Sequence, residues 1–191
     1  PHAPYTVSDE TFIKLPQLAE QHEMQMHCHI HETQDEVDGS LKQYGMRPLE
    51  RLNKLGLLNE KMMAVHMVHL NEDEIAMLAR QKVHLVHNPN SNMKLASGVC
   101  PVTALEAAGV NTILGTDGAA SNNRQDMFGE IRAAALLAKG TTLNPTTVSA
   151  RTALEMATIR AAKAMGRGDD LGSLEVGKLA DVVAISLDAR E

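Results

Sequence analysis

The sequence predicts an α/β fold built around a parallel sheet. Short apolar runs alternate with amphipathic stretches along most of the 191 residues, a rhythm typical of repeated strand–helix–strand units. The content of 43% hydrophobic and 22% charged residues is ordinary for a globular domain. Polar residues that can do chemistry close each apolar run, and in a parallel sheet or barrel these positions open on one face.

Four apolar runs are the expected strands of this sheet, at residues 24–31, 62–69, 83–87 and 110–116. Helices are expected between them, and several have recognisable starts. Ser8 can cap a helix that runs toward Glu23, and Pro48 suits the first turn of a helix that runs to Leu55. Asn71 with Glu74 three residues later has the spacing of a capping box. Two further helices are expected at about 101–108 and 125–138.

The pattern changes in the last third of the chain. A long helical stretch is expected from Asn144 to about Met165, followed by a glycine-rich turn region at 166–177. A final apolar run at 181–186 predicts one more strand, which we assign to another module.

Charge and cysteine content exclude some classes of function. The net charge of −6 comes without any block of lysine or arginine, so no nucleic acid partner is expected. The apolar runs are far shorter than a membrane span, so no membrane partner is expected either. Cys28 and Cys100 form no CxxC pattern, which fits a reducing compartment and predicts a cytoplasmic protein.

The densest group of chemistry-capable residues is the segment from His27 to Glu32. On a strand, the period of two places His27, His29 and His31 on one face, with apolar residues on the other. Imidazoles turned toward a barrel interior need either a metal or a hydrogen-bond network, because unpaired buried polar groups are costly. The segment alone leaves both readings open.

Two other residues end expected strands, and each is ambiguous alone. Asp117 follows an apolar run and precedes small residues that would keep a site open, although such an aspartate is more often a cap or a loop residue. His66 shares a strand face with Ala64 and Val68, and alone it favours a structural role. His22 and His84 are interpreted as non-functional.

Five motifs in order give a specific resemblance. They are PHAPYT at 1–6, HIHET at 29–33, AVH at 64–66, HNPNSN at 87–92 and GTDGAASNN at 115–123. Together they resemble the 5′-methylthioadenosine/S-adenosylhomocysteine deaminases of the amidohydrolase superfamily, relatives of the chlorotriazine hydrolases. The resemblance covers essentially the whole chain.

The resemblance implies a role for each of five residues. His29 and Asp117, expected close together on adjacent strand ends, would bind one divalent metal ion, zinc with Fe²⁺ or Mn²⁺ as alternatives. Asp117 would also act as a base. Glu32 would shuttle protons and, with Asp117, contact the substrate. His66 would hydrogen-bond the attacking hydroxide or the oxygen on the tetrahedral carbon, and His2 would touch the nucleoside. His31 is not expected to be a ligand.

The same resemblance implies an architecture. Residues 1–168 would be the C-terminal half of a metal-dependent-hydrolase TIM-type (β/α)₈ barrel, and residues 169–191 would return into a small β-sandwich. The first-strand His-x-His ligands of such enzymes are expected in an earlier part of a longer protein. The implied assembly is a homo-oligomer, a dimer or a tetramer.

The implied reaction is hydrolytic deamination of an adenine nucleoside, namely 5′-methylthioadenosine, S-adenosylhomocysteine or adenosine. Such chemistry needs hydroxide at neutral pH and a proton for the departing ammonia, which a metal site and a carboxyl group supply. One alternative is a deaminase or chlorohydrolase acting on guanine, cytosine or a triazine. A second is a non-catalytic scaffold with the same fold, which would need none of Glu32, His66 and Asp117.

Overall fold

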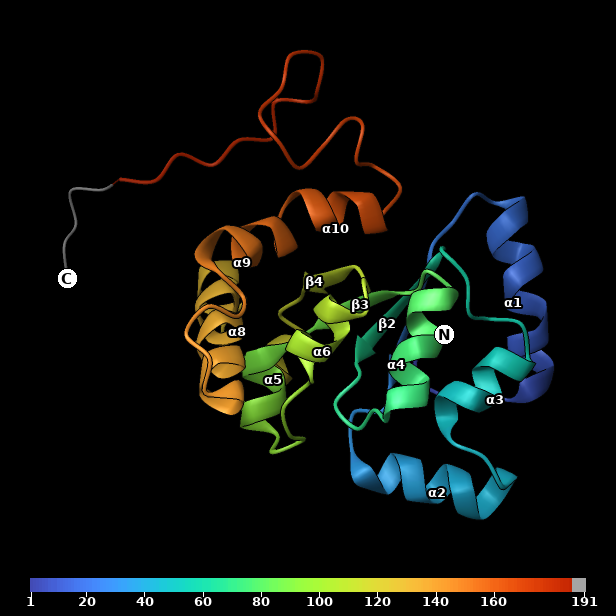
Figure 1. Ribbon diagram of the computed structural model, residues 1–191. Coiled ribbons are helices and arrows are strands. Elements are labelled where there is room, and N and C mark those ends of the chain that lie inside the picture. The colour runs from blue at the N-terminus through green and yellow to red at the C-terminus, as the bar shows by residue number, and fades with distance from the viewer. Residues whose placement is uncertain (187–191) are drawn as a thin grey trace.

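The computed structural model describes residues 1–186, and at their centre lies one sheet of four parallel strands (Figure 1). The strands are β1 (Met26–Ile30), β2 (Met62–His66), β3 (His84–His87) and β4 (Thr112–Leu114). Their spatial order follows the sequence, β1-β2-β3-β4, and every neighbouring pair is parallel. The predicted α/β class and the four parallel neighbours are therefore confirmed.

Helices form all of the connections between these strands, and further helices precede and follow the sheet. They are α1 (Asp9–Gln21), α2 (Gln34–Tyr44), α3 (Pro48–Lys54), α4 (Glu72–Arg80), α5 (Pro89–Lys94), α6 (Val102–Ala107), α7 (Ala119–Asn122), α8 (Met127–Thr142), α9 (Ala150–Met156) and α10 (Ile159–Ala164). The longest, α8, has 16 residues, and within the described part no helix is both long and apolar enough to cross a membrane.

The predicted helix starts are those found in the structure. The Ser8 side chain accepts a hydrogen bond from the Thr11 N–H, which satisfies one of the free donors at the start of α1. Asn71 and Glu74 form a complete capping box at the start of α4. Pro48 occupies the first turn of α3, where its missing N–H costs nothing.

The core lies mainly between the sheet and the helices that cover its outer face. Along β1 the side chains of Met26, Cys28 and Ile30 are buried in this core, while His27 and His29 on the alternate positions are not. A smaller cluster, formed by Val65, Val86 and Ile113 with Ala164 of α10, covers the opposite face of β2 to β4. Strands β2 to β4 are thus covered on both faces, as parallel strands usually are.

Several parts of the chain differ from the sequence-based expectation. Helices α2, α5 and α7 were not expected, although Thr33 caps α2 by accepting a hydrogen bond from the Glu36 N–H. The long stretch from Asn144 to Met165 is interrupted, because Thr158 leaves helical geometry with φ −128° and ψ −101° between α9 and α10. Residues 181–186 form no strand, so this prediction is wrong for the described structure.

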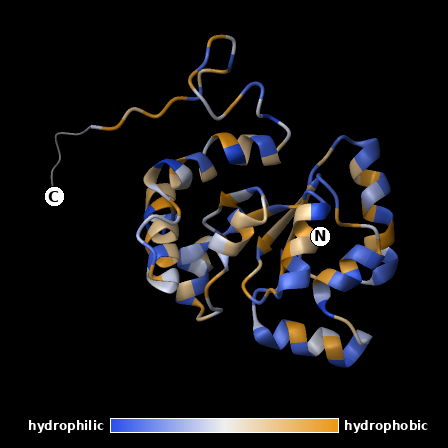
Figure 2. Cartoon of the chain, viewed as in Figure 1, coloured by the Kyte–Doolittle hydropathy of each residue, from blue (hydrophilic) through white to orange (hydrophobic). Residues whose placement is uncertain are grey.

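The segment after α10 lies beyond α9 and α10 at the surface (Figure 1), and Figure 2 shows that it carries many hydrophobic residues. A strand forms only when a neighbouring strand accepts and donates its backbone hydrogen bonds, and within the described residues none pairs with 181–186. The last part of the predicted return segment, 187–191, lies outside the described residues.

Candidate metal-binding and catalytic site

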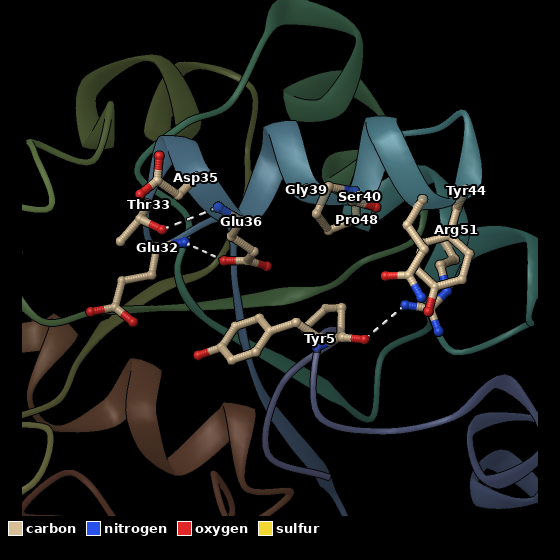
Figure 3. Close-up of a pocket in the computed structure, with 12 residues that line it drawn as sticks. Tyr5, Glu32, Thr33, Asp35, Glu36, Gly39, Ser40, Tyr44, Pro48 and Arg51 are labelled. Carbon is tan, nitrogen blue, oxygen red and sulfur yellow. Dashed lines mark hydrogen bonds between the residues drawn. The ribbon is translucent and has the colours of Figure 1, made fainter.

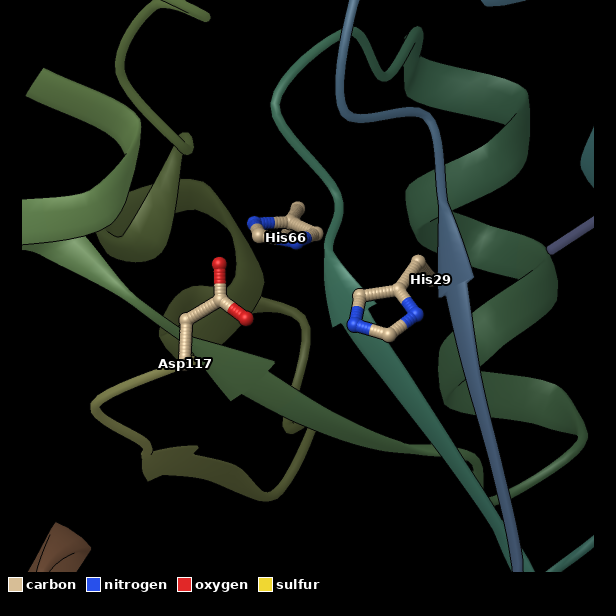
Figure 4. Close-up of side chains that lie close together, drawn as sticks. All are labelled: His29, His66 and Asp117. Carbon is tan, nitrogen blue, oxygen red and sulfur yellow. The ribbon is translucent and has the colours of Figure 1, made fainter. Parts of the chain in front are cut away.

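Three side chains converge at the carboxyl end of the sheet: His29, His66 and Asp117 (Figure 4). One potential ligand atom of each lies within 4.8 Å of the others, so the expected closeness of His29 and Asp117 is found. The expectation that they sit on adjacent strand ends is wrong. His29 belongs to β1 and Asp117 follows β4, and these strands form opposite edges of the sheet. Only a strongly curved sheet brings its two edges together in this way.

His29 is oriented by a backbone carbonyl from another segment. Its Nδ1 lies 2.9 Å from the His2 carbonyl oxygen, which can only accept, so Nδ1 carries the proton. The Nε2 of a neutral His29 is then left with a free lone pair. An imidazole held through its other nitrogen is the usual arrangement of a metal-binding histidine. The ring of His2 lies beside that of His29, with centroids 4.9 Å apart.

Asp117 is held by two short hydrogen bonds. Ser91 donates its hydroxyl to Oδ2 at 2.7 Å, and the Gly118 N–H donates to Oδ1 at 2.7 Å. Burial alone would raise the pKa of Asp117, but these hydrogen bonds and the nearby His66 and His29 keep the pKa below its ordinary value. The carboxylate is therefore ionised at neutral pH, as a metal ligand must be.

His66 is the member of the cluster that lies beside Glu32. Its ring stacks on that of His29 with centroids 5.3 Å apart, and its Nε2 is 3.7 Å from Oε2 of Glu32. Its Nδ1 lies 2.8 Å from Oδ1 of Asn92. Burial lowers the pKa of His66, against the opposing effect of Glu32, so the imidazole is neutral at pH 7.

Glu32 is positioned from two sides. Ser97 donates its hydroxyl to Oε1 at 3.3 Å, and the Glu32 N–H donates to Oε2 of Glu36 at 2.9 Å (Figure 3). Burial raises the pKa of Glu36 to about 7. Both glutamates line a cavity of about 330 Å³, to which Tyr5, Tyr44 and Arg51 also contribute. The cluster thus has an adjoining space that a small organic molecule could enter.

The backbone is strained at the residues that end β1, β2 and β4. His31, His66 and Asp117 have φ values of 56°, 73° and 60°, in the left-handed region that residues other than glycine seldom adopt. Such strain costs about 1–3 kcal/mol per residue and tends to concentrate at functional sites. Here it turns the end of each strand so that the next side chain leaves the regular alternation.

This strain explains why His31 does not share the face of His27 and His29, contrary to the prediction. It is fully buried, its Nδ1 donates to the His69 carbonyl at 3.0 Å, and its Nε2 accepts from the Leu49 N–H at 3.1 Å. Both ring nitrogens are occupied, which agrees with the expectation that His31 is not a ligand. His27 stays on the open face but is exposed.

His87 also departs from the expectation that every strand end points at one place. It lines a separate cavity of about 280 Å³ with Cys100 and with residues of α6 and α8, such as Thr103 and Ala134. Burial lowers its pKa to about 3, so the ring is neutral. The side chain of the following Asn88 lies against Gly115, where an added Cβ would come within 2.5 Å of the Asn88 side-chain amide.

Sequence reasoning missed the residues that hold the site. Ser91 and Asn92 lie in the HNPNSN motif, but nothing in their type or spacing says which strand end they reach. Ser97 and Glu36 lie outside the quoted motifs. Thr33 and Glu36 have the T-x-x-E spacing of a capping box, and this signal could have pointed to Glu36.

The comparisons with known proteins agree with this geometry. The chain matches the amidohydrolase family over residues 1–190. It is 50% identical over 187 residues to a 5-methylthioadenosine/S-adenosylhomocysteine deaminase from Teredinibacter turnerae, covering 98% of this chain and 42% of that protein. The chain spans less than half the length of the curated relatives that it matches.

Solved structures show the same fold. An adenosine deaminase from Xanthomonas campestris with bound zinc has a TM-score of 0.92 and 54% identity, covering 95% of this chain and 41% of that one. A mutant of an atrazine chlorohydrolase from Arthrobacter aurescens, complexed with zinc and atraton, has a TM-score of 0.88 and 30% identity, covering 94% of this chain and 40% of that one. The four strands and their helices therefore correspond to part of a metal-dependent-hydrolase barrel.

Proposed function

Because the chain belongs to the amidohydrolase family, we propose that it forms part of a metal-dependent deaminase of adenine nucleosides. The reaction is hydrolysis of the 6-amino group of 5′-methylthioadenosine, S-adenosylhomocysteine or adenosine, which gives the inosine analogue and ammonia. The observation that carries this proposal is the convergence of His29, His66 and Asp117 within 4.8 Å, with Glu32 next to them.

The proposal assigns residues 1–168 to the C-terminal half of the barrel and 169–191 to the return into a small β-sandwich. The remaining metal ligands, a His-x-His pair, come from an earlier strand of the full-length protein. The assembled enzyme is a homo-oligomer, a dimer or a tetramer. Its compartment is the cytoplasm, which fits the two free, buried cysteines, Cys28 and Cys100.

His29 and Asp117 are the proposed ligands of one divalent metal, zinc in the first place and Fe²⁺ or Mn²⁺ as alternatives. The donor set fits, because it offers an imidazole with one nitrogen already occupied and an ionised carboxylate. A divalent metal held there would lower the pKa of its bound water toward neutrality and so would supply hydroxide at neutral pH.

Glu32 is the proposed proton shuttle. The hydrogen bond from Ser97 holds its carboxyl group beside His66, and the bond to Glu36 holds its backbone. Glu32 also lines the adjoining cavity. From there it can protonate a ring nitrogen of the nucleoside and later pass a proton to the leaving ammonia. Asp117 accepts a proton as the base, and His2, beside His29, contacts the nucleoside.

His66 is proposed to donate a hydrogen bond from Nε2 to the oxygen that forms on carbon 6. Donation requires a proton on Nε2, and then Nδ1 must accept. If Oδ1 of Asn92 faces the ring, Nδ1 of His66 holds the proton instead. The Nδ2 of Asn92 is then buried with no hydrogen-bond partner among residues 1–186. We therefore propose that the Asn92 amide is turned so that Nδ2 donates to Nδ1.

A second candidate is hydrolysis of another amino-heterocycle or chlorotriazine, favoured by the similarity to the atrazine chlorohydrolase. A panel assay on the zinc-loaded full-length protein separates the two. Ammonia release is measured from 5′-methylthioadenosine, S-adenosylhomocysteine, adenosine, guanine and cytosine, and chloride release from a chlorotriazine. The adenine nucleosides should give the highest kcat/KM. A higher value for a base or triazine would contradict the proposal, and an inactive, metal-free protein would favour a non-catalytic scaffold.

A further inference from the structure

A buried carboxylate outside the cluster connects the two segments on either side of Asp117. Glu130 of α8 is fully buried. Its Oε1 accepts hydrogen bonds from the side-chain amides of Asn90 at 2.9 Å and Asn122 at 2.7 Å. Its Oε2 accepts one from the Asn90 N–H at 3.2 Å. Three donors from two short helices, α5 and α7, thus converge on one carboxyl group.

Each of these donors belongs to a segment that places Asp117. Asn90 precedes Ser91, whose hydroxyl donates to Oδ2 of Asp117 at 2.7 Å. Asn122 also donates to the carbonyl of Thr116, the residue before Asp117, at 2.6 Å. Glu130 therefore fixes the serine that orients the aspartate and the backbone that carries it.

The chemistry of the contact requires a carboxylate. Burying a charge is costly unless hydrogen bonds compensate, and in residues 1–186 no cationic side chain forms a salt bridge with Glu130. Both oxygens accept from N–H donors. A glutamine could satisfy one side only, because its amide nitrogen would face a donor. A purely packing role would not need this group.

We propose that Glu130 is a positioning residue for Asp117 and thereby sets the affinity of the site for its divalent metal. The inference depends on the proposed function, in which Asp117 is a metal ligand. Residues that orient ligands from behind typically contribute ~10- to 100-fold to metal affinity. Glu130 acts from α8, an element that carries none of the three clustered residues, through α5 and α7 at once.

The test is the zinc affinity of the full-length protein, measured by competition with a chromophoric chelator, for wild type, Glu130→Gln and Glu74→Gln. Glu74 is the matched control, since it is also nearly buried and lies on a helix, while its partners are Arg47, the start of α4 and His31, which is not a proposed ligand. We expect Glu130→Gln to bind zinc ~10- to 100-fold more weakly and Glu74→Gln to bind it like wild type. Circular dichroism of the metal-free proteins checks that both are folded.

Asn122→Ala provides a second route to the same answer. It removes one donor from a short helix in which no residue is buried, so the fold should survive even if Glu130→Gln does not fold. We expect the same direction of change and, in the double variant, a combined loss smaller than the sum in free energy. Unchanged zinc affinity in folded Glu130→Gln, or in Asn122→Ala if the former does not fold, overturns the inference. A wild-type protein that binds no zinc would overturn the proposed metal site together with it.

Discussion

The carboxyl edge of the sheet and the segment after α10 obey different rules. At the edge, polar side chains such as His29, Asp117 and Glu32 each have partners from other segments of the chain. In the segment after α10, apolar side chains are exposed, with Leu174 at 83% and Val183 at 79%. The comparison teaches that polar and apolar side chains are held by contacts only where other segments of the chain supply their neighbours.

The largest effect is expected at the edge, from His29→Ala in the full-length protein. Loss of the imidazole removes a proposed ligand and one of the two hydrogen bonds that the His2 carbonyl accepts from residue 29. We expect zinc content by elemental analysis to fall to background and deaminase activity to be lost with it. His27→Ala, an exposed position on the same strand face, is the control and should keep its zinc. A zinc-replete, active His29→Ala protein would remove His29 from the site.

Glu32→Gln should separate chemistry from metal binding at the same edge. The glutamine keeps the shape of the side chain but cannot shuttle a proton, so kcat should fall by at least ~10²-fold, with KM changed much less. Zinc content should equal that of wild type. Steady-state kinetics on 5′-methylthioadenosine beside elemental analysis gives both numbers. Near-normal turnover, or loss of zinc, would rule out the proposed role of Glu32.

Asn92→Asp tests the direction of the hydrogen bond to His66. A carboxylate only accepts, so it holds the proton on Nδ1 of His66 and prevents donation from Nε2. We expect kcat to fall by ~10²- to 10³-fold, as when an oxyanion donor is removed, while zinc stays bound. If His66 instead serves as a third ligand through Nε2, the same variant should retain kcat and hold zinc at least as tightly.

Core truncation sharpens the contrast between the two regions. Leu85 is fully buried in the main cluster under β3, so Leu85→Ala should lower the free energy of unfolding by ~2–5 kcal/mol. Leu174→Ala in the exposed segment should change it by less than ~0.5 kcal/mol. Denaturant unfolding of this chain, if it folds alone, or of the full-length protein, measures both. A large loss from Leu174→Ala in the full-length protein only would mean that another part of that protein covers this segment.

Near neutral pH, the smallest effect on the free energy of unfolding is expected from the protonation of His87. The pKa of His87 is about 3 in the folded state against an ordinary value of 6.5, so only the unfolded chain takes up its proton between these values. The stabilisation is complete above pH 6.5 and is lost as the pH falls toward 3, by about 1.4 kcal/mol per pH unit. His87→Leu should flatten the dependence of unfolding free energy on pH by this slope. An equally steep dependence in the variant would show that other groups are responsible.

Local signals predicted local structure well. The caps at Ser8 and at Asn71 with Glu74 are complete within a few residues, so their sequence pattern sufficed. The burial of His31 could not be predicted, because it depends on a left-handed backbone stabilised by contacts with distant His69 and Leu49. The approach of His29 and Asp117 came from a resemblance between motifs, whereas the curvature that joins opposite edges of the sheet is a property of the whole fold.

The left-handed backbone at Asp117 has a consequence for how this position tolerates change. With φ at 60°, asparagine and glycine can occupy the site with little added strain, whereas a β-branched residue such as valine cannot. Variants with asparagine or glycine at this position would thus be produced in normal amounts yet lack the carboxylate. A variant with valine would also give a lower yield of folded protein. A mutational scan scored for abundance and the same scan scored for turnover would therefore rank the substitutions at this one codon differently.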